Sequence, residues 1–215
     1  MSEKEKVRVL VVDDHAIIRK GITQLLRDTD DLEVVAEAQN GVEALQLIRD
    51  NPYDVVLLDI SMPGEHGIDV LARIKEIKPD LPVLMLSMYP EDQYAIRSLK
   101  AGASGYVNKQ DALNQMVLAI RQVSSGRKYI SSDLAVQLAE HLTQHSQELP
   151  HQNLSNREYQ TLCLIASGKK LSEIAENMML SAKTVSVYRA RLLEKMKMRT
   201  NAELIHYAIT HNLVP

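Results

Sequence analysis

The sequence predicts a doubly wound parallel α/β sheet of five strands, followed by a small all-α domain of four helices. In the first half of the chain, five short apolar runs alternate with segments of helical periodicity, at intervals of 22–28 residues. Beyond the fifth run no strand pattern follows, and the remaining periodic segments have the spacing of helices. The formal charge also changes sign, from −4 over residues 1–128 to +4 over residues 151–215, as expected for two domains with different partners.

The apolar runs define the predicted strands, which are 7–12, 32–38, 54–59, 82–87 and 104–109. Three of them are nearly continuous in Val and Leu, as expected for strands whose two faces are both buried. The helical segments between and after them are 15–28, 41–50, 67–77, 91–102 and 111–123. The first four can form the right-handed crossovers that join parallel strands, so helices are expected on both faces of the sheet.

The second half is predicted to be helical. An amphipathic helix at 131–142 leads into a polar linker, after which Ser155 and Glu158 form a capping box at the start of the next helix. The four helices of the last domain are predicted at 157–168, 171–179, 182–196 (capped by Ser181) and from Asn201 onward. Short helices with tight connections are typical of a helix-turn-helix module.

The composition excludes several classes of protein. With 45% hydrophobic and 25% charged residues, the 215-residue chain is typical of folded globular proteins. No apolar run approaches the roughly 18 residues of a membrane span, and the N-terminus lacks a signal-peptide pattern. The single cysteine, Cys163, excludes an internal disulfide framework. A cytoplasmic protein with no membrane partner is therefore expected.

Polar side chains collect where the predicted strands end. Asp13 and Asp14 follow the first strand, and Asp59 ends the third. Ser87 ends the fourth strand and Lys109 the fifth. Each alone is explained by a helix cap or a solvated charge, but the carboxyl ends of parallel strands meet at one edge of a sheet, where ligands bind. We therefore expect these groups to form one site.

Three carboxylates and one lysine leave that predicted site negatively charged. Two carboxylates about 4 Å apart repel by about 4 kcal/mol at an effective dielectric of about 20. The cluster should therefore raise a carboxyl pKa or recruit a divalent cation. Oxygen ligands in an open site favour Mg²⁺, and a carboxylate beside Mg²⁺ can attack a phosphoryl group. The sequence thus predicts phosphoryl-transfer chemistry at this edge.

The segments VVDDH, LLDISMPGEHG, LMLSMY and GASGYVNK resemble the receiver domain of bacterial two-component response regulators, over about residues 7–125. This resemblance implies a flavodoxin/CheY-like fold. It also implies that Asp59 accepts a phosphoryl group from a sensor histidine kinase or a small acyl phosphate. In the family pattern Mg²⁺ is held by Asp14, Asp59 and the backbone carbonyl of Ser61, with Asp13 assisting through water.

The same resemblance extends to a pair of switch residues. Ser87 and Tyr106 match the family's switch positions, where the hydroxyl turns toward the phosphoryl group and the aromatic ring follows inward. Lys109 matches the lysine that pairs with the phosphoryl oxygens. Asn108 and Gln110, which flank that lysine, depart from the Leu and the Asp or Pro more usual in the family.

The helix predicted at 182–196 has an apolar and a basic side. At about 100° per residue its apolar face is expected to pack inward. That face consists of Val185, Tyr188, Leu192 and Met196. Between residues 181 and 199 there are six basic residues and one acid, which suits a DNA-facing helix.

Residues 152–213 resemble the LuxR-type helix-turn-helix of the NarL/FixJ class of regulators, and TVSVYRARLLEKM with AELIHYAI is most similar to the GacA/UvrY/SirA branch. The resemblance implies a transcriptional regulator that binds double-stranded DNA, forms a homodimer when phosphorylated and works with RNA polymerase. Base contacts are expected from Ser186, Val187 and Ala190, the last two through thymine methyl groups. Phosphate contacts are expected from Lys183, Thr184, Arg191 and Lys195.

The domain limits are therefore predicted as 7–125 for the receiver, 126–151 for a linker with an amphipathic helix, and 152–215 for the DNA-binding domain. One alternative makes the last domain a protein-interaction module, which a steep fall of DNA affinity with salt would contradict. Another makes the first half a phosphotransfer enzyme with an external substrate. Since no GxxxxGK[ST] nucleotide loop is present, no turnover of an external substrate is expected.

Overall fold

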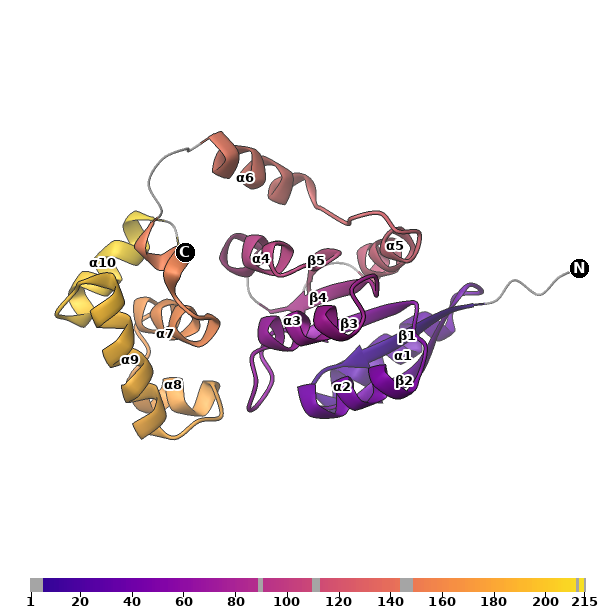
Figure 1. Cartoon of the computed structure of the whole chain (residues 1–215), viewed down its shortest axis with the longest axis horizontal. Helices are drawn as coiled ribbons and strands as arrows, with labels where there is room; N and C mark the ends of the chain where they lie inside the picture. Colours follow the sequence, from indigo (N-terminus) through magenta and orange to yellow (C-terminus); the bar gives the residue numbers. More distant parts are fainter. Residues whose placement is uncertain (1–5, 89–90, 110–112, 144–148, 212, 215) are drawn as a thin grey trace, which may run out of the picture. The chain divides into compact units, whose positions relative to one another are not determined.

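The computed structural model describes the chain except for residues 1–5, 89–90, 110–112, 144–148, 212 and 215 (Figure 1). It divides into two compact units, Met1–Leu138 and Ala139–Pro215, called here the N-terminal and C-terminal units. Within the described ranges, no helix is long and apolar enough to cross a membrane.

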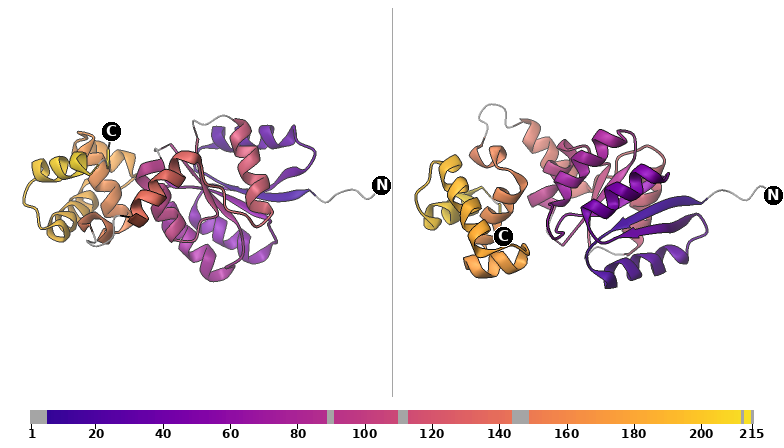
Figure 2. Two further views of the ribbon diagram at one scale, coloured as in Figure 1. Left: turned by 90° about the horizontal axis from the view of Figure 1, so that it is seen from above. Right: turned by 60° about the horizontal axis from the view of Figure 1, so that its bottom comes forward.

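The N-terminal unit is built on a parallel sheet with the strand order β2-β1-β3-β4-β5. The strands are β1 (Val7–Val12), β2 (Leu32–Ala38), β3 (Val55–Asp59), β4 (Val83–Ser87) and β5 (Gly105–Asn108). Every residue of β3 and β4 is buried, because helices cover both faces of the sheet. Figure 2 shows α1 and α5 on one face and α2 and α3 on the other. The predicted fold class is confirmed.

The helices follow the predicted segments closely. Those of the first half are α1 (Ala16–Arg27), α2 (Gly41–Asp50), α3 (Gly67–Ile77), α4 (Glu91–Lys100) and α5 (Leu113–Ser124). Those of the second half are α6 (Ser132–Thr143), the 3₁₀ turn η1 (Pro150–Asn153), α7 (Asn156–Ala166), α8 (Leu171–Asn177), α9 (Ala182–Met196) and α10 (Asn201–Thr210). The capping box of Ser155 and Glu158 and the Ser181 cap are confirmed.

The last helix begins at Asn201, as predicted. Thr200 is its N-cap, because its hydroxyl accepts a hydrogen bond from the Glu203 backbone amide. The Glu203 carboxylate in turn accepts from the amides of Arg199 and Thr200. This closed capping box satisfies backbone amides that the helix itself leaves without a partner.

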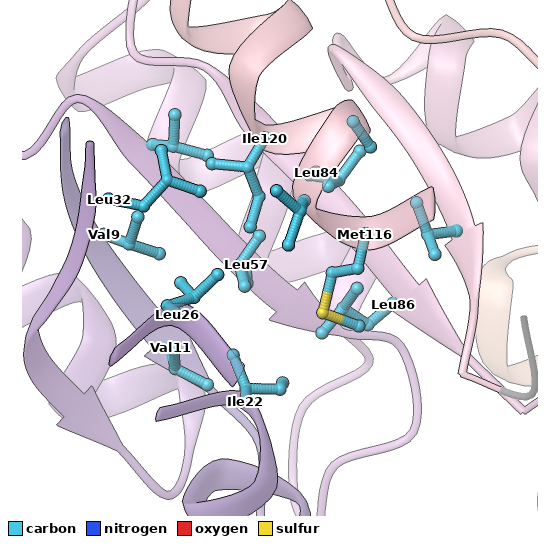
Figure 3. Packing of buried hydrophobic residues seen from close by; sticks show 14 of the residues in the cluster. Val9, Val11, Ile22, Leu26, Leu32, Leu57, Leu84, Leu86, Met116 and Ile120 are labelled. Atoms are coloured by element: carbon cyan, nitrogen blue, oxygen red, sulfur yellow. The ribbon is translucent and has the colours of Figure 1, made fainter. Parts of the chain in front are cut away.

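One aliphatic core fills the space between the sheet and the helices α1 and α5 (Figure 3). Its labelled side chains are Val9, Val11, Leu32, Leu57, Leu84 and Leu86 from the strands, with Ile22, Leu26, Met116 and Ile120 from the helices. All are at most 7% exposed, so the chain builds this core without Phe or Trp. The core fixes the strands, and with them the residues at the strand ends.

After α5 the chain returns along the outer strand of the sheet. The amide of Tyr129 donates to the carbonyl oxygen of Ser104 over 2.9 Å, and Tyr129 pairs with Gly105 in an isolated parallel bridge. The Lys128 ammonium donates to the carbonyl oxygen of Ala103 over 2.6 Å. A Cβ at Gly105 would lie 2.7 Å from the backbone carbonyl oxygen of Tyr129, so only glycine allows the two backbones to come this close. Tyr129 also packs against the aliphatic core, so contacts of the N-terminal unit continue beyond residue 125.

In the C-terminal unit, α7 packs against α9 and α10, and α8 packs against α9. The turn between α8 and α9 passes through Met179, which adopts a left-handed conformation with φ 51°. The side chains that close this small core are fully buried, and they are Leu162, Ile174, Val185, Leu192, Leu204 and Ala208. The arrangement is that of the predicted helix-turn-helix module.

Candidate functional site

The sheet brings the predicted acidic and basic groups together at one edge. Asp13 follows β1, and Asp59 ends the neighbouring strand β3. Ser87 ends β4 on the other side of β3, and the Lys109 backbone amide donates to the Ser87 carbonyl oxygen over 2.7 Å. That bond holds the residue after β5 beside the end of β4, which directs Lys109 to the centre of the edge.

Lys109 bridges two buried carboxylates. Its Nζ lies 2.6 Å from Oδ2 of Asp13 and 2.8 Å from Oδ1 of Asp59, and all three side chains are at most 5% exposed. One ammonium does not neutralise the cluster. Burial raises the pKa of the Asp59 carboxyl, and the charge of Asp13 raises it further, while Lys109 and the backbone amide of Ser61 partly offset the rise. A raised carboxyl pKa is one of the two outcomes that the sequence predicts for this cluster.

A third carboxylate completes a group that can bind a cation. The Asp14 side chain is 10% exposed, and its buried Oδ1 accepts no hydrogen bond from any described residue. One ligand atom each from Asp13, Asp14, His15 and Asp59 lies within 4.8 Å of the others. A buried carboxylate oxygen without a donor is expensive unless a cation satisfies it, so these residues fit a divalent metal ion.

The start of α3 is pressed against the end of β3. The Gly67 amide donates to the Ile60 carbonyl oxygen over 2.8 Å, and His66 caps α3 by accepting from the Ile68 amide at Nδ1. A Cβ on Gly67 would lie 2.1 Å from the Asp59 carbonyl oxygen. Only glycine fits here, and this contact fixes the backbone that carries the Asp59 carboxylate.

The two predicted switch residues lie on neighbouring strands. Ser87 at the end of β4 and Tyr106 on β5 are both fully buried. The aromatic ring of Tyr106 is therefore inside the N-terminal unit in this conformation. Any change in either side chain has to be a change of packing, because neither is open to solvent.

The α9 helix has the two sides predicted for it. Val185, Leu192 and Met196 are buried, whereas Tyr188 is only half-buried. Most of the predicted DNA-contacting side chains are exposed, and these are Lys183, Ser186, Val187, Ala190, Arg191 and Lys195. Val187 is a large apolar side chain at 44% exposure, which leaves it available for contact with a methyl group.

Three of the predicted DNA-contacting residues already have partners inside the unit. The Lys195 ammonium lies 2.7 Å from Oε2 of the buried Glu158 on α7. The Thr184 hydroxyl lies 2.8 Å from the hydroxyl of the N-cap residue Ser181. Ser186 donates its hydroxyl proton to the Ala182 carbonyl oxygen over 2.9 Å, so toward a base it can only accept while that bond lasts.

The Lys195–Glu158 pair joins α9 to α7. Burial alone raises the pKa of Glu158, but hydrogen bonds from Lys195 and Ser155 outweigh it, so the pKa lies below its ordinary value of 4.5. A carboxyl with a lowered pKa stabilises the fold above its unfolded-state pKa, and that stabilisation is lost as the pH falls through the folded-state value.

Glu158→Gln is therefore expected to destabilise the C-terminal unit by about 1–2 kcal/mol at neutral pH, since it removes the ion pair and weakens the cap of α7. The difference from the parent should shrink below pH 4.5, where the parent loses the same interaction. Hydrogen exchange of the α7 and α9 amides measures the free energy of unfolding in the variant and in the parent. Glu194→Gln, on the exposed side of α9, is the control and should stay within about 0.5 kcal/mol. An equal effect of the two substitutions would contradict a stabilising role of the Lys195–Glu158 pair.

The two parts of the chain match two known families. Residues 9–121 match the response regulator receiver domain, and residues 152–208 match the bacterial regulatory proteins of the luxR family. The chain is 40% identical to the response regulator UvrY of Escherichia coli over 208 residues, 96% of this chain and 95% of that protein. It is 42% identical to the response regulator GacA of Pseudomonas protegens over 209 residues, 97% of this chain and 98% of that protein.

A solved structure resembles the chain over both units. RcsB of Salmonella enterica serovar Typhimurium, solved bound to the promoter P1flhDC in the presence of the phosphomimetic BeF₃⁻, is 25% identical, with a TM-score of 0.60. The match covers 94% of this chain and 98% of RcsB. We call the edge of the sheet that carries Asp13, Asp14 and Asp59 the acidic edge. This edge and the exposed face of α9 thus occur in a chain that is similar, over nearly its full length, to response regulators.

Proposed function

Because this chain belongs to the two-component response regulators, with a receiver domain joined to a LuxR-type DNA-binding domain, we propose that phosphorylation of Asp59 controls its binding to promoter DNA. The observation that carries the proposal is the position of Asp59, buried at the centre of the acidic edge and bridged to Asp13 by Lys109. The phosphoryl donor is a sensor histidine kinase or a small acyl phosphate.

The residues that would hold Mg²⁺ are Asp14, Asp59 and the Ser61 backbone carbonyl, with Asp13 acting through a water molecule. When bound, Mg²⁺ supplies positive charge that reduces repulsion between the carboxylates and the incoming phosphoryl oxygens. An oxygen of Asp59 forms the new bond to phosphorus, and the leaving atom of the donor departs with the electron pair of the broken bond. Lys109, already 2.8 Å from Asp59, then pairs with a phosphoryl oxygen. The phosphoryl group stays on the chain's own carboxylate, so no external substrate is turned over.

Ser87 and Tyr106 would couple phosphorylation of Asp59 to a change at the surface of the N-terminal unit. The Ser87 hydroxyl turns toward a phosphoryl oxygen as a donor, and the Tyr106 ring occupies the buried position seen here. Phosphorylation does not need to create this arrangement. It raises the population of a packing that the chain already adopts.

The exposed face of α9 is the proposed contact with double-stranded DNA. Lys183 and Arg191 bind phosphates, while Val187 and Ala190 face the bases. A single small module binds weakly, so a phosphorylated homodimer on two half-sites is expected to form, with RNA polymerase as a further partner. A regulator of promoters in a bacterium works in the cytoplasm, which we propose as its location.

The proposal is tested by following phosphorylation and DNA binding together. The full chain is incubated with Mg²⁺ and acetyl phosphate, its intact mass is measured, and its affinity for a DNA duplex obtained by selection is determined before and after. Addition of about one phosphoryl group with a gain in DNA affinity is expected. Failure to take up a phosphoryl group would contradict the acceptor site. Phosphorylation that leaves the DNA affinity unchanged would contradict the coupling.

Arg191→Ala should weaken binding to every duplex to a similar extent, because a phosphate contact carries no sequence information. The slope of log affinity against log salt concentration should decrease by about 0.9 for the one lost contact. Fluorescence anisotropy over a series of salt concentrations measures both quantities. Glu194→Ala, on the same exposed side of α9, should leave this slope unchanged or steeper. A change of sequence preference without a change of slope would show that Arg191 contacts bases.

A further inference from the structure

His15 lies beside the acidic cluster, and we propose that its imidazole is a ligand of the metal site, which makes the site selective for a first-row transition dication such as Mn²⁺ over Mg²⁺. The inference rests on the proposed function, because it concerns the same metal site. His15 follows the two carboxylates Asp13 and Asp14 directly at the end of β1.

The position of His15 is compatible with that of a metal ligand. Its Nδ1 lies 2.9 Å from Oδ1 of Asp14 and 3.3 Å from Oδ1 of Asp13. Two ligand atoms at right angles, each about 2.1 Å from a metal ion, are about 3 Å apart. The contact with Asp14 has this spacing but lacks the geometry of a hydrogen bond, since Oδ1 of Asp14 has no hydrogen-bond partner among the described residues.

His15 is tied to Asp13 by two hydrogen bonds: its backbone amide donates to Oδ1 over 2.8 Å, and its Nδ1 lies 3.3 Å from the same oxygen. Lys109 contacts Oδ2 of Asp13 and Oδ1 of Asp59, so the other oxygen of Asp13 faces His15. His15 is the N-cap residue of α1, but its side chain makes no capping hydrogen bond. The side chain is also 59% exposed, so packing does not hold it in place. The ring nitrogen of His15 therefore lies close to one carboxylate oxygen each of Asp13 and Asp14. The Asp14 oxygen is buried and accepts no hydrogen bond from any described residue.

A nitrogen ligand changes which ion the site prefers. Mg²⁺ binds oxygen ligands and gains little from an imidazole, whereas affinity for nitrogen rises along the first-row transition dications. The competing interpretation is that His15 acts as a counter-ion to the carboxylates. A counter-ion opposes every dication alike, so its removal would tighten the binding of both ions by a similar factor.

The test compares Mn²⁺ and Mg²⁺ binding to the full chain, without a phosphoryl donor, in the parent, His15→Ala and His206→Ala. Calorimetric titrations at pH 8 keep proton competition for the ring nitrogen small. Pulsed electron paramagnetic resonance of bound Mn²⁺ detects a coordinated ¹⁴N nucleus. In His15→Ala we expect Mn²⁺ to bind about tenfold more weakly, Mg²⁺ to change by less than about twofold, and the nitrogen coupling to disappear. His206, exposed on α10, is the matched histidine control and should give the parent result.

The outcomes separate this proposal from the one it rests on. If His15→Ala changes the affinity for both ions by the same factor, or if parent protein with bound Mn²⁺ shows no nitrogen coupling, His15 is not a ligand, and the proposed phosphorylation at Asp59 is unaffected. If the parent binds neither ion, both the His15 ligand and the metal site of the proposed function are overturned.

Discussion

Asp59→Asn is expected to abolish phosphoryl uptake, from about one group per chain in the parent to none, when both are incubated with Mg²⁺ and acetyl phosphate and weighed as intact proteins. The amide has no charged oxygen to form the bond to phosphorus. Because its shape is that of the carboxylate, the start of α3 and the neighbouring strand ends should keep their places. Asp54→Asn is the control, since Asp54 precedes the same strand at its opposite end, where its carboxylate accepts from the Arg8 amide. If Asp59→Asn took up as much phosphoryl group as the parent, another residue would be the acceptor.

The same substitution should raise the stability of the N-terminal unit at neutral pH. The pKa of Asp59 is raised mainly by burial, so the protonated form is favoured in the folded state. The stability that this proton binding provides is present in acid and is lost as the pH rises through the folded-state pKa. Asparagine stays neutral throughout. The unfolding midpoint of the variant should therefore exceed that of the parent at pH 7, and the gap should close as the pH falls.

Gly67→Ala is expected to destabilise the N-terminal unit by about 3 kcal/mol or more and to slow phosphorylation strongly. The added Cβ would lie 2.1 Å from the Asp59 carbonyl oxygen and 2.7 Å from Cα of Ile60. Both are backbone atoms, so a side-chain rotation cannot relieve the overlap. Either α3 moves away from the sheet, or the end of β3 moves and takes the Asp59 carboxylate with it. Urea unfolding gives the change in free energy, and the rate of mass gain with acetyl phosphate gives the effect on the site.

Gly21→Ala is the matched control for this substitution. Gly21 lies inside α1, where an added Cβ would have no atom within 4 Å and the backbone is helical. Alanine there should stabilise the unit by up to about 1 kcal/mol and leave phosphorylation unchanged. Opposite signs for the two glycines would show that the contact with β3, and not helix propensity, decides the result at Gly67. An unfolding free energy for Gly67→Ala equal to that of the parent would contradict the close packing.

The fold was predictable because its signals are local. The runs ending at Val12, Ala38, Asp59 and Ser87 consist mostly of apolar residues, and each is followed by a segment with the period of a helix. Such patterns need no knowledge of distant residues. The acidic edge was predictable for a related reason, since a parallel sheet brings the carboxyl ends of its strands together whatever the details of packing.

The partners of the α9 side chains were not predictable in this way. Lys195 has the position of a phosphate-binding residue on a helical projection, but the pairing with Glu158 spans 37 residues and depends on how α7 and α9 pack. Ser186 is different, because its bond to Ala182 follows from the four-residue spacing that hydroxyl side chains use inside helices. That bond could have been anticipated from the sequence.

His15 was missed although a signal was present. The sequence predicts an oxygen-only site that includes Asp13 and Asp14, although a histidine directly follows them. Successive side chains of a β-strand point to opposite faces, so three successive residues of a strand are not expected to meet at one place. Here β1 ends at Val12, and the backbone turns before α1 begins at Ala16, so the Asp13, Asp14 and His15 ligand atoms converge.

The bridge between Tyr129 and Gly105 has a consequence for any attempt to study the receiver alone. The strand β5 is the last in the sheet, and an uncovered last strand offers free amides and carbonyls to a second molecule. Cutting the chain at residue 125 removes the residues that cover part of that strand. Such a fragment should self-associate through β5 whether or not it carries a phosphoryl group. A fragment that extends through Ile130 keeps that part of the strand covered, so its association on phosphorylation would test the proposed dimerisation.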